Sequence, residues 1–461
     1  MKNKLLRILF LTLFGCAGFY LFKSWDIFRE KTSFEVEKFQ FSPTEVNVEE
    51  VKTSFKEPVW FVKTDTSMVC FTIKFKNEGN RSFYKTPGLL DVVLSTLIEG
   101  SGSRDGIEFK KILNEKATSI SVTNDNDDIL VTVSCLAKYF DVAVELLCDI
   151  LSKAHLKKEK LEISKQGLCT SIRQSQFNTG AVAAQRMNNL LYPEGHPYRY
   201  QHDNTLKMVQ TYTKKDADKC YAQIFDPNNA CMTIVGNLDK TQIIETCKKI
   251  HESISQKKND FKNVKQETKL RKSGVSVHVP LDNPQSTVLF SLPGVLKLSD
   301  ERYAVRIANM ILGMVGFNSR LWKALRDEDG SVYGVVSSTN DEDMQATISG
   351  SARTRPGNTK QVIDKIKKII AVFFEKGITQ EELDVIKTTA FSHDIAGSTD
   401  SVLAFVLNCR DGNIPRDQVS RAYYRYYDLS FEKVNAAVKK YFDPSKLIFV
   451  SCGKSVKETK K

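Results

Sequence analysis

The chain has 461 residues, more than one hydrophobic core usually supports, so two or more domains are expected. Its 41% apolar and 26% charged residues form an ordinary globular composition. The formal net charge of +12 does not indicate a nucleic-acid partner, because the sequence has no basic helix interleaved with aromatic residues and no zinc-finger spacing.

The first 23 residues are predicted to be a signal peptide or a membrane anchor. Lys2, Lys4 and Arg7 precede the apolar run of residues 8–22. Cys16 is a weak match to a lipid-attachment site, because the residues after it stay apolar. We expect export to the periplasm, with residues 5–22 as a candidate inner-membrane anchor, and a polar lead-in over residues 24–56.

An N-terminal domain of strands and helices in blocks is predicted over residues 57–255. Gly88 opens the first core helix, and an acidic turn joins two strands as a hairpin. The expected strands are 59–62, 69–75, 120–123, 129–135 and 230–235, and the expected helices are 89–98, 107–114, 140–151, 158–173 and 181–191.

The same order of elements returns after a basic linker predicted over residues 256–273. Thr123 begins an acidic stretch that recurs from Thr339, an offset of 339 − 123 = 216, and the triplet beginning at Phe225 recurs at Phe442, an offset of 442 − 225 = 217. Two matches at nearly one offset indicate an internal duplication. We therefore predict an α+β fold made of two similar units, the second over residues 274–455.

The second unit contains a candidate peptide-binding segment at residues 318–333. They read as the end of an apolar helix, an acidic turn closed by Gly330 and the start of a strand. Arg326 falls off the buried face of this helix, and Tyr333 opens the strand seven residues later. The pair could hold backbone carbonyls or the terminal carboxylate of a peptide. Alternatively, Arg326 caps helix carbonyls and Tyr333 lies at the rim of a core.

The ten cysteines contain no C-x-x-C pair, and nine of them lie beyond Cys16, an odd number that argues against a complete disulfide framework. The chain also has no G-x-S-x-G, Walker or G-x-G-x-x-G motif. The sequence therefore shows no motif of a serine hydrolase, a P-loop nucleotidase or a dinucleotide-binding enzyme.

Together these segments resemble the insulinase/pitrilysin-type (inverzincin) zinc peptidases, in the processing-peptidase-like branch. The resemblance rests on the following segments: Gly88-Leu89, Gly195-His196-Pro197-Tyr198, Asp226-Pro227 to Gly236, Ser319-Arg320-Leu321, Leu325-Arg326 with Tyr333, and Phe442-Asp443-Pro444 to Gly453. It implies two units per chain, each an antiparallel sheet backed by helices, and pairs of such chains closing around an unfolded peptide.

The zinc site that the resemblance implies is missing. Active members carry H-x-x-E-H on the first core helix, where two imidazoles bind zinc and the glutamate activates water. The equivalent positions hold Asp91, Leu94 and Ser95, and the position of the distal glutamate ligand holds Ser171. We expect no metal and no cofactor in this chain, and we take Asp91 and Ser95 as solvated or cap-like polar residues.

The resemblance implies that Arg326 and Tyr333 match a pair that reaches the bound peptide opposite the zinc. We therefore expect a metallopeptidase homologue that is inactive alone: a non-catalytic subunit of an exported heterodimeric zinc endopeptidase. Its expected partners are a homologous subunit that carries the zinc, an unfolded peptide and the membrane at the N-terminal segment. The alternative is a structural or peptide-binding pseudo-peptidase with no role in proteolysis.

Overall fold

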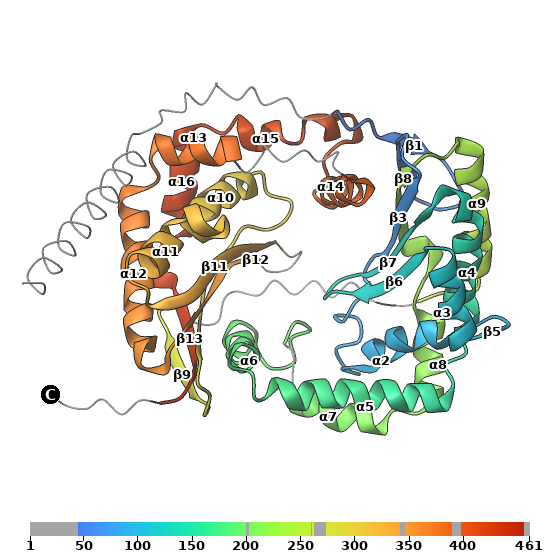
Figure 1. Ribbon diagram of the computed structural model, residues 1–461, viewed down its shortest axis with the longest axis horizontal. Helices are drawn as coiled ribbons and strands as arrows, with labels where there is room; N and C mark the ends of the chain where they lie inside the picture. Colours follow the sequence, from blue (N-terminus) through green and yellow to red (C-terminus); the bar gives the residue numbers. More distant parts are fainter. Residues whose placement is uncertain are drawn as a thin grey trace, which may run out of the picture. The chain divides into compact units, whose positions relative to one another are not determined.

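The computed structural model describes residues 45–199, 202–259, 261, 273–341, 346–389 and 398–455 (Figure 1). The predicted signal peptide or anchor, Cys16 and most of the basic linker lie outside these residues. Within them, no helix is both long and apolar enough to cross a membrane.

The N-terminal half is built on a six-stranded sheet with the order β1-β2-β8-β3-β7-β6. Its strands are β1 (Glu49–Val51), β2 (Val59–Lys63), β3 (Met68–Phe75), β6 (Ser119–Asn124), β7 (Ile129–Leu136) and β8 (Ala230–Gly236). All neighbours are antiparallel except β2 and β8. Strand β3 alternates, so that Phe71 and Ile73 belong to the main core while Cys70 belongs to a second apolar cluster on the other face.

Helices cover the face of this sheet that carries the main core (Figure 1). They are α2 (Leu89–Thr96), α3 (Gly106–Glu115), α4 (Phe140–Lys153), α5 (Lys158–Ser175), α7 (His202–Thr211), α8 (Lys214–Gln223) and α9 (Lys240–Ile254). Helix α6 (Thr179–Leu191) packs on the C-terminal sheet instead. A short hairpin of β4 (Gly100–Ser101) and β5 (Arg104–Asp105) follows α2. Side-chain caps fix several starts, including Asp105 at α3 and the capping box of Thr213 and Asp216 at α8.

The C-terminal half repeats this plan with a five-stranded sheet in the order β11-β12-β10-β13-β9. Its strands are β9 (Ser276–Pro280), β10 (Ser286–Pro293), β11 (Val332–Asp341), β12 (Ala346–Thr354) and β13 (Ile448–Gly453). Its helices are α10 (Glu301–Asn309), α11 (Arg320–Trp322), α12 (Thr359–Lys376), α13 (Gln380–Thr389), α14 (Thr399–Asp411), α15 (Tyr424–Tyr427) and α16 (Phe431–Tyr441). Strand β11 forms an edge of the sheet.

The two halves exchange one helix each. Helix α6 packs on β10 and β13 of the C-terminal sheet, and α14 packs on β3 and β8 of the N-terminal sheet. The two helices have 13 residues each, and both ends are related by one offset, 399 − 179 = 220 and 411 − 191 = 220. The exchange is therefore part of the duplicated unit, and the predicted α+β duplication is confirmed.

Most of the predicted elements are found, including the hairpin of β6 and β7. Strand β1 was not predicted, because its three residues lie in a polar stretch. The nine cysteines in the described part of the chain are all free thiols, eight of them buried, as the odd count indicated.

Candidate functional site

The first core helix carries no metal-binding set. Gly88 precedes it with φ of 82°, and a Cβ there would lie 2.6 Å from Val209 Cγ2, so the position requires glycine. Asp91 on this helix is half-buried, and its Oδ1 accepts a hydrogen bond of 3.3 Å from Asn124 Nδ2. Burial raises the pKa of Asp91, and the hydrogen bond from Asn124 only partly opposes it.

The other three positions offer no ligand that zinc prefers. Leu94 is buried and apolar, and the Ser95 hydroxyl donates to the carbonyl of Val92 in its own helix (3.0 Å). Ser171 is exposed on α5. Among the described residues, no group of three His, Cys, Asp or Glu side chains could hold a metal ion. The residues therefore do not fit the zinc site of active relatives.

The histidine-containing loop beside Asp91 is a packed structure. Asp91 and His196 both line a cavity of about 320 Å³. His196 is buried, its Nδ1 accepts from the backbone N–H of Tyr198 (3.1 Å), and its ring stacks on Tyr192 at 4.9 Å between centroids. These contacts order the loop.

Arg326 lies in the last turn before the acidic turn of the C-terminal half. Its segment, Lys323–Asp327, is a π-helix that continues α11. The side chain is exposed and makes no hydrogen bond or ion pair with any residue that the structure describes. The alternative in which Arg326 caps helix carbonyls is therefore not observed.

Tyr333 is placed by a β-bulge. The pairing of β11 with β12 shifts between Val332 and Gly334, which leaves Tyr333 as the extra residue. Val332 and Val335 are buried, whereas Tyr333 is 51% exposed, so the bulge puts Tyr333 on the face away from the helices. Its hydroxyl also has no partner among the described residues.

The structure brings both residues to the same end of β11. The Ser331 backbone N–H donates to the Leu325 carbonyl (3.0 Å), which closes the turn between Arg326 and Tyr333. Gly330 takes φ of 58° within this turn. The pair thus flanks one hydrogen-bonded turn at the start of the edge strand.

The neighbouring motif residues hold this helix in place. Arg320 binds Glu382 with two hydrogen bonds of 2.6 and 2.7 Å, and Leu321 is fully buried. Ser319 donates to the carbonyl of Gly316 (2.7 Å). These residues therefore position the segment that carries Arg326.

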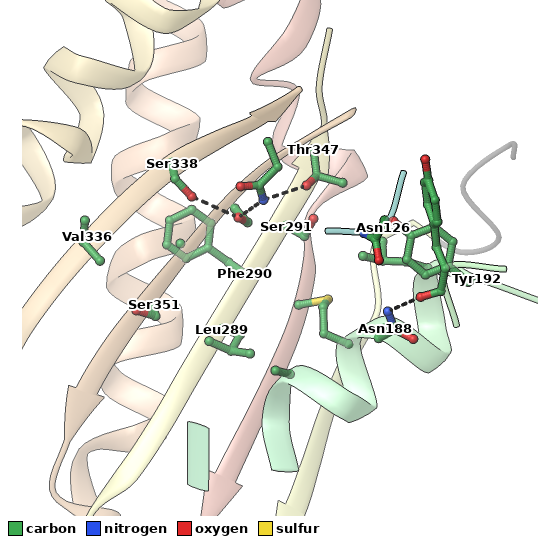
Figure 2. Close-up of a pocket in the computed structure, with 17 residues that line it drawn as sticks. Asn126, Asn188, Tyr192, Leu289, Phe290, Ser291, Val336, Ser338, Thr347 and Ser351 are labelled. Carbon is green, nitrogen blue, oxygen red and sulfur yellow. Dashed lines mark hydrogen bonds between the residues drawn. The ribbon is translucent and has the colours of Figure 1, made fainter. Parts of the chain in front are cut away.

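A cavity of about 420 Å³ on the same sheet face was not predicted from the sequence (Figure 2). It lies between α6 and the strands β10, β11 and β12, and Val336 of β11 belongs to its lining. The sheet contributes mainly small polar side chains: Ser291, Ser338, Asn340, Thr347, Ser349 and Ser351. The one available signal was the recurrence of serine at alternate positions of the strands, which ordinary solvent-exposed strands also show.

Comparison with known proteins supports the resemblance drawn above. Residues 211–390 match the family described as the Peptidase M16 inactive domain. The chain is 25% identical over 318 residues to the non-peptidase homolog YmxG of Helicobacter pylori, covering 68% of this chain and 72% of that protein. It is 18% identical over 294 residues to an uncharacterized zinc protease of Streptomyces coelicolor, covering 62% of this chain and 63% of that one.

Solved structures share the fold. A peptidase M16 inactive domain from Pseudomonas fluorescens superposes with a TM-score of 0.82 at 20% identity, covering 89% of this chain and 98% of that one. A protease from Helicobacter pylori gives a TM-score of 0.77 at 17% identity, covering 89% and 100%. With the family match over residues 211–390 and the relatives above, these likenesses show that the chain has the fold of M16 peptidase structures and is similar to the insulinase/pitrilysin-type family that its sequence resembles.

Proposed function

We propose that this chain is the non-catalytic subunit of an exported heterodimeric zinc endopeptidase. It would contribute to the peptide chamber and supply Arg326 and Tyr333 to a homologous partner that carries the zinc. The observation that carries the proposal is a contrast within the chain. The residues at the metal position do not fit zinc, whereas Arg326 and Tyr333 at one end of an edge strand have polar groups without a partner among the residues that the structure describes.

The two side chains have the chemistry for this role. The Tyr333 hydroxyl can donate a hydrogen bond to the oxyanion that develops on a scissile carbonyl. The Arg326 guanidinium offers a fixed fork of donors for peptide carbonyls or a carboxylate. Water activation would come from the partner subunit, because the position of its catalytic glutamate holds Leu94 here.

Export is part of this proposal and rests on the N-terminal sequence. The charged residues Lys2, Lys4 and Arg7 and the apolar run after them favour delivery to the periplasm, with residues 5–22 as a signal or an anchor. Fractionation of cells expressing the full chain with a C-terminal tag would test it. Recovery in the cytoplasm would contradict export.

Co-expression with the zinc-motif homologue encoded in the same genome tests the central role. We expect a stable complex that cleaves unfolded peptides, and we expect Arg326→Ala and Tyr333→Phe to lower kcat by at least about tenfold without releasing the partner. Lys323→Ala, an exposed residue on the same π-helix, is the matched control. No complex, or activity unchanged in both variants, would contradict the proposal.

A second candidate is a structural or peptide-binding pseudo-peptidase without a role in proteolysis. The name of the Helicobacter pylori relative, a non-peptidase homolog, favours it. It predicts peptide binding or assembly by the chain with no gain of hydrolysis when the zinc-motif homologue is added. The co-expression assay therefore separates the two candidates.

A further inference from the structure

The cavity between α6 and the C-terminal sheet has the features of a side-chain subsite (Figure 2). Its volume of about 420 Å³ falls in the range of small-ligand pockets. Met187 and Leu191 of α6 form an apolar wall, and Ser349 and Ser351 of β12 belong to the polar floor. A ligand held there would meet apolar groups on one side and hydroxyls on the other.

The lining is electrically neutral. None of the 17 described residues that line the cavity is Asp, Glu, Lys, Arg or His. A charged group that entered would lose hydration without meeting an opposite charge, which is costly. The cavity therefore selects against charged ligands.

The floor offers hydrogen bonds that the protein itself leaves unused. Asn340 donates through Nδ2 to Ser349 Oγ (2.8 Å) and Thr347 Oγ1 (3.2 Å), so its Oδ1 is left to accept. Ser291 is only 1% exposed, and its buried hydroxyl has no hydrogen-bond partner among the described residues. A buried polar group without a partner costs free energy that a hydrogen-bonding ligand would recover.

The N-terminal half has charged side chains at the positions that correspond to this cavity. With the offset of 217, Ser291 of β10 corresponds to Lys74 of β3, since 74 + 217 = 291. In the N-terminal half, Lys74 Nζ reaches across to Asp411 on the exchanged helix α14 at 2.7 Å. With the offset of 220, Asp411 corresponds to Leu191 of α6, since 411 − 220 = 191. The position of an ion pair in one half is thus a neutral cavity in the other.

We propose that this cavity binds an uncharged, hydrogen-bonding side chain, such as glutamine or asparagine, of an extended peptide. The inference rests on the proposed peptide-binding function, and it adds the class of side chain that is selected. A peptide is favoured over a free sugar because the cavity includes Val336, which shares the open face of edge strand β11 with Tyr333. An extended chain along this face could engage Tyr333 and the cavity together.

The test measures binding of short fluorescein-labelled peptides of alanine and glycine that differ only in one central residue. We expect the glutamine peptide to bind the purified full-length chain at least about tenfold more tightly than the glutamate or lysine peptide. Ser291→Ala and Asn340→Ala should reduce the preference for glutamine over leucine. Ser349→Asp should invert the charge selectivity, so that the lysine peptide binds more tightly than the glutamine peptide.

Ser337→Ala is the matched control, because Ser337 lies on β11 with its side chain buried on the opposite face, where it donates to Asn309. It should leave the selectivity unchanged. Thermal unfolding of each variant checks that the fold is intact, and Ser349→Asp supplies a gain of function that a misfolded protein would not show.

The outcomes separate this inference from the proposed function. One outcome is that all the peptides bind with equal affinity and that Arg326→Ala and Tyr333→Phe weaken this binding. It would overturn the inference and leave the proposed function standing. Binding of none of the peptides would overturn both. Binding of a neutral oligosaccharide that Ser291→Ala weakens, without peptide binding, would overturn the choice of a peptide.

Discussion

The two sheets carry their exchanged helices in different ways. On the N-terminal sheet, α14 packs through an apolar cluster and is also held by charged side chains: Asp411 binds Lys74, and Arg410 donates to the backbone carbonyls of Met232 (2.6 Å) and Pro58 (2.9 Å). On the C-terminal sheet, α6 is held by apolar contacts, and a neutral cavity remains beside it. In the N-terminal half, the Lys74–Asp411 ion pair fills the space between the sheet and its exchanged helix. In the C-terminal half, the equivalent space is a cavity on the sheet face that also carries Tyr333.

The closed face is built around one deeply buried lysine. Lys74 is 5% exposed and is paired with both Asp128 (3.1 Å) and Asp411 (2.7 Å). Burial alone would lower the pKa of Lys74, but the two carboxylates outweigh burial and raise it, so the lysine stays charged. Losing any member of such a cluster leaves buried charge uncompensated.

Removing this lysine should give the largest effect. We expect Lys74→Ala to lower the free energy of unfolding by about 3 to 5 kcal/mol in urea denaturation, because Asp128 would lose its cation and Asp411 would keep only the longer pair with Lys297 (3.8 Å). The control is Lys76→Ala, which breaks a half-exposed pair with Glu57 and should cost less than about 1 kcal/mol. Equal losses of unfolding free energy in the two variants would contradict a stabilising role for the Lys74 ion pairs.

The apolar attachment of α6 should give a smaller loss. Leu190 is 6% exposed in the cluster between α6 and the C-terminal sheet. Leu190→Ala should lower the free energy of unfolding by about 2 to 3 kcal/mol, because methyl groups leave a packed interface next to an existing cavity. Ile163→Ala, at a position 61% exposed on α5, should change it by less than about 0.5 kcal/mol. A loss at Ile163 as large as at Leu190 would count against this attachment.

Two serines on opposite faces of the C-terminal sheet give a finer test. Ser337 donates to Asn309 Oδ1 (2.8 Å), so Ser337→Ala should cost about 1 kcal/mol. The Ser291 hydroxyl has no partner among the described residues, so Ser291→Ala should cost nothing or stabilise the fold slightly. The reverse order of the two unfolding free energies would show that the cavity face is not open.

The smallest effect on stability is expected at Tyr333. The side chain is half-exposed and its hydroxyl has no partner in the described part of the chain, so Tyr333→Phe should shift the free energy of unfolding by less than about 0.5 kcal/mol. Peptide binding, followed by fluorescence anisotropy, should nevertheless weaken. A variant that loses stability while binding normally would make Tyr333 a structural residue.

Local signals were enough to predict the duplicated plan. Gly88 marks the start of α2, the acidic turn marks the hairpin of β6 and β7, and recurring segments such as Phe225 and Phe442 mark the repeat. Each depends on residues close in sequence, where turn chemistry and periodicity act directly. The expectation that Asp91, Leu94 and Ser95 form no zinc site came from the family resemblance and stays a prediction.

The remaining features depend on long-range packing. The bulge that turns Tyr333 to the open face is a property of how β11 pairs with β12, and alternation along β11 alone does not reveal it. The exchange packs α6 and α14 on strands that are distant from them in the sequence, which no local pattern specifies. The cavity exists only because that exchange places α6 over Ser291 and its neighbours.

We propose that this chain binds a peptide through its C-terminal half and needs no metal of its own to do so. The most direct test is peptide binding by the purified chain in the presence of a strong zinc chelator, for the natural sequence and for the double variant with Arg326→Ala and Tyr333→Phe. We expect the chelator to leave the affinity of the natural chain for the peptide unchanged. We expect the double variant to bind the peptide at least about tenfold more weakly. Binding that the chelator abolishes, and that the double substitution leaves intact, would contradict it.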